Sequence, residues 1–178
     1  MYRISELIQL DKKLVHTNDL AILWGIKNRQ TLYQTITRYI DKGILFQVYK
    51  GLYATVPPES LNPLELGRAI IHRYAYLTTE TVLAQAGVIS QRVFAYTFAT
   101  DQSKHLSVGQ WTFRFRKLKE IYLYNTAGID EQNGSFVATL ERAVADMLYF
   151  NPRYHFDLRE AIDFEKVHAL QREIGYPC

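Results

Sequence analysis

The stretch from residue 17 to residue 55 constrains the fold of this chain most, because two amphipathic segments and one alternating segment follow each other directly. The first segment starts at Thr17, whose hydroxyl is suited to capping a helix, and it ends at Gly25. The second starts at Asn28, a common N-cap residue, and runs to Lys42. The pattern therefore predicts a helix, a turn and a second helix.

The second predicted helix has an apolar face and a polar face. Apolar residues recur at helical spacing on one face, which we expect to be buried. The other face carries hydrogen-bonding and cationic side chains, of the kind that contact base edges and phosphates in a DNA major groove. The expected buried positions are Leu32, Ile36, Tyr39 and Ile40. The candidate DNA-binding residues are Asn28, Arg29, Gln30, Tyr33, Gln34, Thr37 and Arg38.

Residues 44–55 alternate between apolar and polar types around the sequence Tyr49-Lys50-Gly51, which predicts a β-hairpin with a tight turn. Lys50 would lie near the tip of that turn and is a candidate phosphate contact. Helix, turn, helix and hairpin in this order are typical of a winged helix-turn-helix. Residues 2–10 would supply a further helix whose inward positions are Ile4, Leu7 and Ile8. The alternative interpretation is an ordinary helix pair whose polar face is merely solvated.

The composition favours a folded cytoplasmic protein. The chain has 178 residues, of which 48% are hydrophobic, enough for one medium domain or for a small domain followed by a medium one. The single cysteine, Cys178, cannot form a disulfide within one chain, which suits a reducing compartment. No apolar run approaches the roughly 18 residues of a spanning helix, and no signal peptide is recognisable. We therefore expect no membrane association.

Charge and proline positions divide the chain into two parts. Residues 1–56 contain eight Lys and Arg against four acidic residues, whereas the remainder contains thirteen against fourteen. A basic module suits a polyanionic partner. Pro57 and Pro58 interrupt helix and sheet, so we predict a DNA-binding domain over 1–56 and a regulatory domain over 57–178. The expected fold class is α+β, with an N-terminal winged helix-turn-helix followed by a mixed helix and small antiparallel sheet domain.

The second part contains predicted helices and predicted strands. Strands are expected over 93–100, 112–116 and 121–124, where β-branched and aromatic residues gather. Helices are expected to begin near residues 62, 78, 139 and 157, with a second cap at Asp163. The sequence TFRFR places Phe113 and Phe115 on one face of its strand, and Arg114 and Arg116 on the other. Together with Lys117 and Lys119, these arginines are expected to contact nucleic acid or an acidic partner; otherwise they form a solvated face.

The order of these segments resembles the AbiEi-type antitoxins of type IV toxin-antitoxin systems, a family of bacterial transcriptional regulators. The likeness rests on LYQTITRYIDKGILFQVYKGLYAT, YLTTETVLAQAGVI, FAYTFAT and TLERAVADML. It implies that the winged helix-turn-helix binds inverted repeats of double-stranded operator DNA at the promoter of its own operon, as a monomer or homodimer. It also implies that the second domain counteracts a nucleotidyltransferase-like toxin. The resemblance implies that the candidate residues on the second helix contact DNA and that Lys50 contacts a phosphate from the wing. It assigns no role to any residue of the second domain.

The sequence contains no sharp catalytic signature. The five histidines lack metal-ligand spacing, and neither a phosphate-binding loop nor a nucleophile elbow is present. We therefore predict no enzymatic activity, cofactor, catalytic residue or metal. The strongest enzymatic alternative is metal-dependent nucleic-acid chemistry at Glu141 and Asp146, with Glu80 or His155 nearby. We favour a structural role, in which Arg142 pairs with an acid. A second alternative is a protein-interaction module that binds a toxin and has little role in DNA binding.

Overall fold

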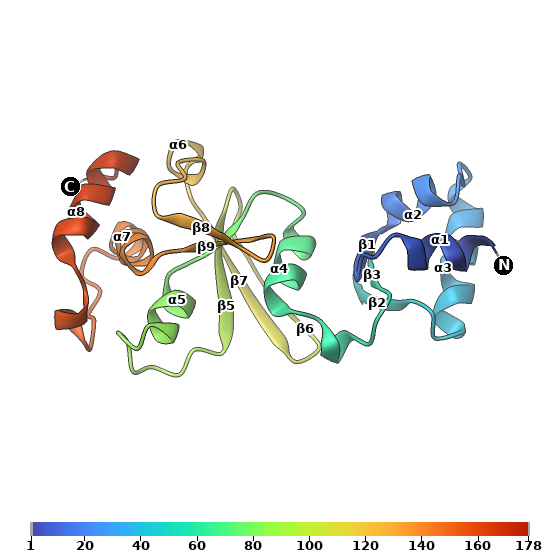
Figure 1. Ribbon diagram of the computed structural model, residues 1–178, viewed down its shortest axis with the longest axis horizontal. Helices are drawn as coiled ribbons and strands as arrows, with labels where there is room; N and C mark the ends of the chain where they lie inside the picture. Colours follow the sequence, from blue (N-terminus) through green and yellow to red (C-terminus); the bar gives the residue numbers. More distant parts are fainter. Residues whose placement is uncertain (1, 178) are drawn as a thin grey trace. The chain divides into compact units, whose positions relative to one another are not determined.

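The computed structural model describes the backbone of residues 2–177 and the side chains of residues 5–177. It contains both helices and strands, which confirms the α+β class (Figure 1). The chain divides into two compact units. The first comprises Met1–Asn62 together with Val108–Gln110, and the second comprises Pro63–Ser107 and Trp111–Cys178.

The first unit packs helices on a small antiparallel sheet. Strand β3 lies between β1 and β2 and is antiparallel to both. Trp24 and Tyr39 form the aromatic centre of its core, with ring centroids 5.2 Å apart. The elements are α1 (Tyr2–Gln9), β1 (Leu14–His16), α2 (Thr17–Leu23), α3 (Arg29–Asp41), β2 (Phe46–Tyr49) and β3 (Leu52–Ala54).

Two details at the start of the chain differ from the sequence prediction. Thr17 is the first residue of α2 and does not cap it; its hydroxyl donates to the Gly51 carbonyl, 3.2 Å away. The helix start is held instead by Asp19, which accepts a hydrogen bond from the backbone N–H of His16 at 3.0 Å. In α1, Leu7 is buried as expected, but Ile8 is 74% exposed, so its inward placement was wrong. The side chain of Ile4 lies outside the described residues.

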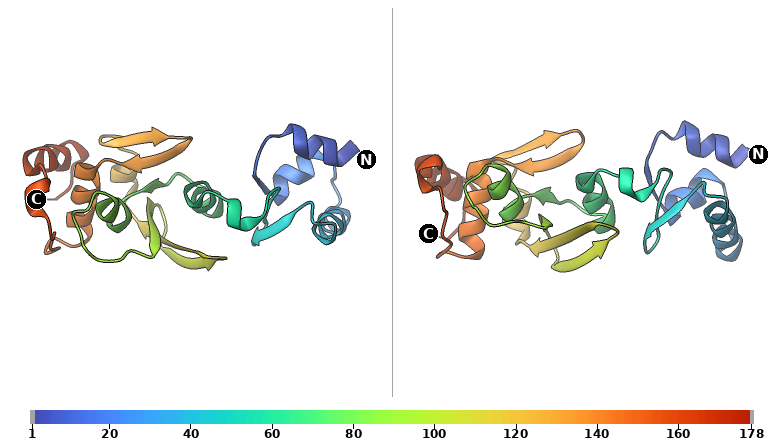
Figure 2. Two further views of the ribbon diagram at one scale, coloured as in Figure 1. Left: turned by 60° about the horizontal axis from the view of Figure 1, so that its bottom comes forward. Right: turned by 90° about the horizontal axis from the view of Figure 1, so that it is seen from below.

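The second unit contains a mixed sheet with the strand order β6-β7-β5-β4-β9-β8. The expected small antiparallel sheet was therefore wrong, because β5 runs parallel to β7, and β4 runs parallel to β9. Figure 2 shows β7 in yellow and the β8–β9 hairpin in orange, apart from each other in the sheet. The strands are β4 (Tyr76–Leu77), β5 (Ala95–Thr100), β6 (Lys104–Val108), β7 (Trp111–Lys117), β8 (Ile129–Gln132) and β9 (Ser135–Ala138).

Helices cover both faces of this sheet. Figure 1 shows α4 on one side of it, with α5 and α7 on the other and α8 outside α7. Helix α4 lies close to the strands at Gly67, where an added Cβ would come within 2.6 Å of the Phe98 ring. The helices are α4 (Pro63–Ile71), α5 (Glu80–Gln85), α6 (Glu120–Leu123), α7 (Leu140–Phe150) and α8 (Phe164–Ile174).

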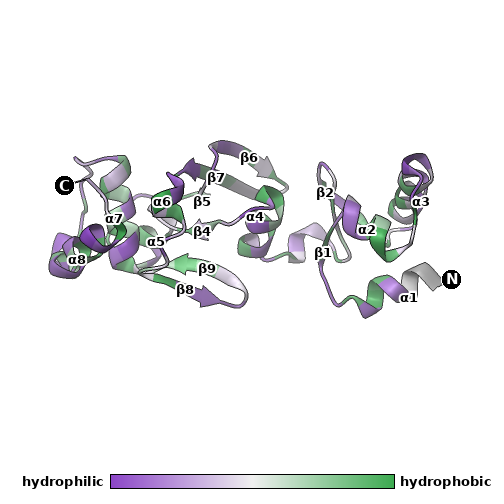
Figure 3. Ribbon diagram, turned by 90° about the horizontal axis from the view of Figure 1, so that it is seen from above, coloured by the Kyte–Doolittle hydropathy of each residue, from purple (hydrophilic) through white to green (hydrophobic). Residues whose placement is uncertain are grey.

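Some predicted elements of the second unit are confirmed and one is wrong. Thr139 caps α7 by accepting from the Arg142 N–H, and Asp163 caps α8 by accepting from the Lys166 N–H. The predicted strand over 121–124 is wrong, because these residues belong to the short helix α6 and the turn after it. Figure 3 shows why β8 was missed: it is mostly hydrophilic, whereas its partner β9 is mostly hydrophobic.

Candidate nucleic-acid interface

Helix α3 presents one continuous polar face to solvent. Leu32, Ile36 and Tyr39 are buried in the core of the first unit, as their helical spacing predicted, and Ile40 is half-buried. The exposed residues on and around the opposite face are Asn28, Arg29, Gln30, Tyr33, Gln34, Thr37 and Arg38. At 100° per residue, Gln30, Gln34 and Thr37 fall near the middle of this polar face. Burial of one face thus fixes the direction of the other.

The start of α3 is fixed by its own cap. The Asn28 side-chain oxygen accepts hydrogen bonds from the backbone N–H of Thr31 at 3.0 Å and from the Thr31 hydroxyl at 3.3 Å. Both lone pairs of that oxygen are therefore used within the helix. The side chain of Asn28 can contact a ligand only through its amide N–H groups. The cap leaves the first turn exposed, where backbone N–H groups and the helix dipole favour an anion.

The two arginines of α3 lie beside aromatic rings. The Arg29 guanidinium carbon is 5.8 Å from the centroid of the Tyr33 ring, one turn further along the helix. Arg38 lies 5.8 Å from the Tyr39 centroid. Such contacts restrain a long side chain while its N–H donors stay available to solvent. Asp41, on the polar face at the C-terminal end, adds a negative charge there, so an anionic ligand is favoured nearer the start of the helix.

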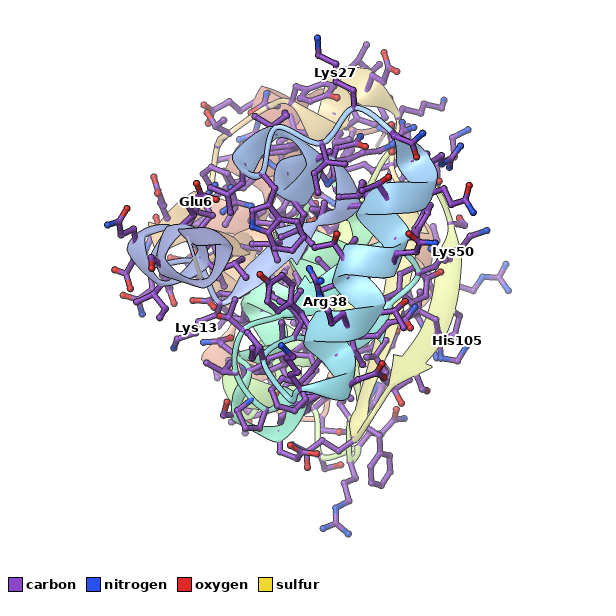
Figure 4. The ribbon with its side chains drawn as sticks, turned by 90° about the vertical axis from the view of Figure 1, so that its right-hand side faces the viewer. Glu6, Lys13, Lys27, Arg38, Lys50 and His105 are labelled. Carbon is purple, nitrogen blue, oxygen red and sulfur yellow. The ribbon has the colours of Figure 1, made fainter. Side chains whose placement is uncertain are left out.

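Lys50 is exposed in the turn between β2 and β3. Gly51 has φ +73°, a left-handed conformation that glycine adopts without strain. Its carbonyl accepts from both the backbone N–H and the hydroxyl of Thr17, at 3.0 and 3.2 Å. These bonds tie the turn to the start of α2. In Figure 4, Lys50 and Arg38 lie on opposite sides of α3, so that cations flank the helix.

Sequence reasoning placed Glu141 and Asp146 in an alternative catalytic site, but Asp146 is fully buried in a side-chain network. One carboxylate oxygen accepts from Arg142 Nε at 2.8 Å and from the Tyr176 hydroxyl. The other accepts from the hydroxyls of Tyr76 and Thr78, at 2.9 and 2.8 Å. Both oxygens are thus occupied away from solvent, and Glu141 on the same helix is only half-buried.

Arg142 uses all five of its N–H groups in the same network. Besides Asp146, its guanidinium donates to the Tyr76 hydroxyl and to three backbone carbonyls in the segment before β8. The carbonyls belong to Tyr122, Asn125 and Ala127. Arg142 therefore joins α7 to the chain around α6, which agrees with the expected ion-pair role. The sequence signalled neither Tyr76 nor Tyr176 as a partner, because each is distant in the chain.

The ionisation of the network follows from burial and charge. Burial alone would lower the pKa of Arg142, but the neighbouring Asp146 and the two tyrosines raise it above its ordinary value, so the guanidinium stays charged. Burial, with the nearby Asp146 carboxylate, raises the pKa of Tyr76 and Tyr176. Both phenols therefore stay protonated as hydrogen-bond donors. Within residues 5–177, no group of three or more His, Cys, Asp or Glu is arranged to hold a metal ion.

The arginines of β7 have a partner that was not predicted. Phe113 and Phe115 are buried, which confirms the alternation of this strand. Arg114 and Arg116, on the other face, both contact the Glu80 carboxylate at the start of α5. This pair was expected to be a solvated or partner-binding face, and the structure adds an acid that orients it.

Comparisons with known proteins give no family for this chain. No model of a known protein family matches it, and a search of curated proteins finds no significant match. Among the described helices, none has the length and apolar character needed to cross a membrane.

Proposed function

We propose that this chain is a DNA-binding transcriptional regulator whose first unit is a winged helix-turn-helix. The observation that carries the proposal is α3, which buries one face in a core and exposes a polar face flanked by cations. The element order α1-β1-α2-α3-β2-β3 and the strand order β1-β3-β2 also suit a winged helix, with the β2–β3 turn as its wing. The chain then acts in the cytoplasm without a catalytic step.

The mechanism is occupancy of a promoter. Helix α3 enters the major groove, where Arg29, Gln30 and Gln34 contact base edges. Lys50 on the wing and the backbone N–H groups at the start of α3 contact phosphates, which position the protein without selecting a sequence. The bound protein then blocks access of the polymerase to the operon that encodes this protein. Inverted repeats are occupied by two copies or by a homodimer.

The likeness to AbiEi-type antitoxins supports a second activity, in which the second unit counteracts a nucleotidyltransferase-like toxin. Co-expression with such a toxin tests it: restored growth that needs the second unit supports it, and unchanged toxicity contradicts it.

The experiment that tests DNA binding is titration of the full chain into its own upstream region and into scrambled DNA, at several salt concentrations. Single Arg29→Ala and Gln30→Ala variants should each lose about 1–3 kcal/mol on the operator and relax specificity, whereas Lys50→Ala should weaken both DNAs alike. Affinity should fall steeply with salt, because each neutralised phosphate releases counterions.

A matched control removes the same number of cations elsewhere in the first unit. The α3 triple variant, Arg29→Ala with Gln30→Ala and Arg38→Ala, should lose operator binding. The control variant, Gln9→Ala with Lys12→Ala and Lys13→Ala, removes the same amount of charge. In Figure 4, Lys13 lies on the side of the unit away from Lys50. The control should keep operator binding. Equal losses on operator and scrambled DNA for the Arg29 and Gln30 variants contradict the assignment of base contacts.

One observation favours a second candidate, a protein-interaction module. Ile22 on α2 is 81% exposed, and Tyr33 on α3 is 42% exposed, so the first unit offers exposed apolar side chains to a protein. Under this alternative, Ile22→Ser abolishes co-purification of a protein partner, and no DNA is preferred over any other. If Ile22→Ser keeps operator binding and the α3 triple variant loses it, the result favours the transcriptional regulator over the protein-interaction module.

A further inference from the structure

The second unit contains a groove beside β6 and β7 with a volume of about 650 Å³. Its lining combines basic side chains with two phenylalanines, Phe115 and Phe150. The basic residues are Lys104, His105, Arg114, Arg116 and Lys117. His105 is labelled on its strand in Figure 4. The groove belongs to the second unit alone and shares no residue with the α3 surface.

The two arginines in the groove are held in place before any ligand binds. Glu80 Oε1 accepts from Arg116 and, at 3.4 Å, lies near Arg114 Nη1. The other oxygen of Glu80 accepts from the Thr79 hydroxyl at 2.7 Å, so the carboxylate is itself fixed. Because each guanidinium has five N–H groups, one contact to Glu80 leaves donors for an anion. Pre-ordered side chains lose less entropy on binding.

The Arg116 guanidinium also lies over an aromatic ring. Its central carbon lies 5.1 Å from the centroid of Phe150, at the end of α7. A guanidinium supported on one face by a ring offers its other face to a planar group, and nucleobases stack on arginine planes and aromatic rings in this way. The exposed imidazole of His105 is a further planar group in the groove.

The charge balance of the groove favours an anionic ligand. Four of its lining residues are cationic, namely Lys104, Arg114, Arg116 and Lys117, whereas the Glu80 carboxylate contacts the two arginines from outside the lining. Arg114 and Arg116 converge on Glu80 Oε1, whereas Lys104 and Lys117 lie where the start of β6 meets the end of β7, next to the hydrogen bond from the Lys117 N–H to the Ser103 hydroxyl. The groove therefore offers more than one position for a negative charge, which matches a chain of phosphates better than one compact ion.

We propose that this groove binds single-stranded nucleic acid, with phosphates on Arg114 and Lys117 and a base against the Arg116–Phe150 pair. An acidic peptide would use the same cations, but it would have no need of the planar groups beside them. The proposal does not rest on operator binding, because it concerns the other unit and another form of nucleic acid.

The test is fluorescence anisotropy of a labelled single-stranded oligonucleotide with the full chain carrying Arg29→Ala, Gln30→Ala and Arg38→Ala. These changes disable the α3 surface, so remaining binding comes from elsewhere. If four cations each neutralise one phosphate, affinity should fall roughly 50-fold between 50 and 200 mM salt. Adding Arg114→Ala and Lys117→Ala should weaken binding at least 10-fold and about halve the salt dependence.

The control adds Lys119→Ala and Arg172→Ala, which remove two exposed cations of the same unit outside the groove lining. It should bind the oligonucleotide as tightly as its parent. Phe150→Leu, which keeps an apolar side chain but removes the ring, should weaken binding without changing the salt dependence. Circular dichroism of each variant verifies that the unit is folded.

Three results overturn the proposal. The first is equal binding by the groove variant and its control. The second is efficient competition by polyglutamate. If polyglutamate displaces the labelled oligonucleotide at the same concentration of negative charges as an unlabelled oligonucleotide does, the groove is assigned to an acidic protein. The third is an affinity for a mononucleotide equal to that for the strand, which assigns it to a free nucleotide.

Discussion

A single phenol hydroxyl illustrates how the buried network depends on protonation. The Tyr176 hydroxyl donates to the Asp146 carboxylate, and burial raises its pKa above the ordinary value of a tyrosine. Below about pH 10 the phenol is protonated in both the folded and the unfolded chain, so pH has no effect through it. Above about pH 10 the unfolded chain releases a proton that the fold retains. The free energy of unfolding should therefore fall as pH rises.

This sign gives a prediction for Tyr176→Phe. The wild-type unfolding free energy should decrease by up to about 1.4 kcal/mol per pH unit through this residue above pH 10, and the variant should lack that contribution. Urea denaturation between pH 8 and pH 11 measures it. Tyr124→Phe, at an exposed tyrosine of the same unit, should keep the wild-type slope. An unchanged slope in Tyr176→Phe contradicts the argument.

In the first unit, a turn glycine shows how stability depends on local backbone geometry. Gly51 has φ +73°, and an added Cβ would lie 3.3 Å from the Thr17 hydroxyl oxygen. Gly51→Ala should lower the stability of this unit by about 1–2 kcal/mol, because a side chain is strained at this φ. Trp24 fluorescence during denaturation measures the loss. Gly43→Ala has a similar φ of +66° with no atom near its Cβ. It serves as the control and should cost less.

At the scale of elements, sequence periodicity predicted the helices that have one apolar face, but it did not predict a strand that is mostly polar. It gave α3 and α7 with their caps, because Asn28 and Thr139 stand before clear helical repeats. It missed β8, whose side chains are mostly exposed, although Asn133-Gly134 is a strong hairpin signal. The sequence prediction also lacked β6, and this affected the predicted sheet topology more. Strand β6 runs back along the sheet after β5, so that β7 can run parallel to β5.

The candidate sites divide in the same way. The polar face of α3 follows from helical spacing alone, so its residues are visible in the sequence. The Arg142–Asp146 pair is at i, i+4 and was partly foreseen, but its burial depends on Tyr76 and Tyr176, which only the folded chain brings near. Glu80 likewise meets Arg116 across 36 residues. No periodic pattern encodes contacts of that sequence separation.

At the scale of the whole molecule, the two compact units predict separable effects of mutation. Asp146→Asn leaves the buried Arg142 without its carboxylate, which should destabilise the second unit by about 3–5 kcal/mol. The first unit has its own core around Trp24 and should be unaffected. The chain has two tryptophans, Trp24 and Trp111, and they report on the first and second unit respectively.

Single-tryptophan variants, Trp24→Phe and Trp111→Phe, therefore measure each unit separately during urea denaturation. Asp146→Asn should shift only the transition seen through Trp111 and should leave operator affinity unchanged. Replacing both partners, as Arg142→Met with Asp146→Leu, should recover part of the lost stability, because no unpaired charge then remains buried. If both tryptophans report the same shift, the units unfold as one cooperative structure. DNA binding would then depend on the buried pair, and mutations in the second unit would affect repression through stability alone.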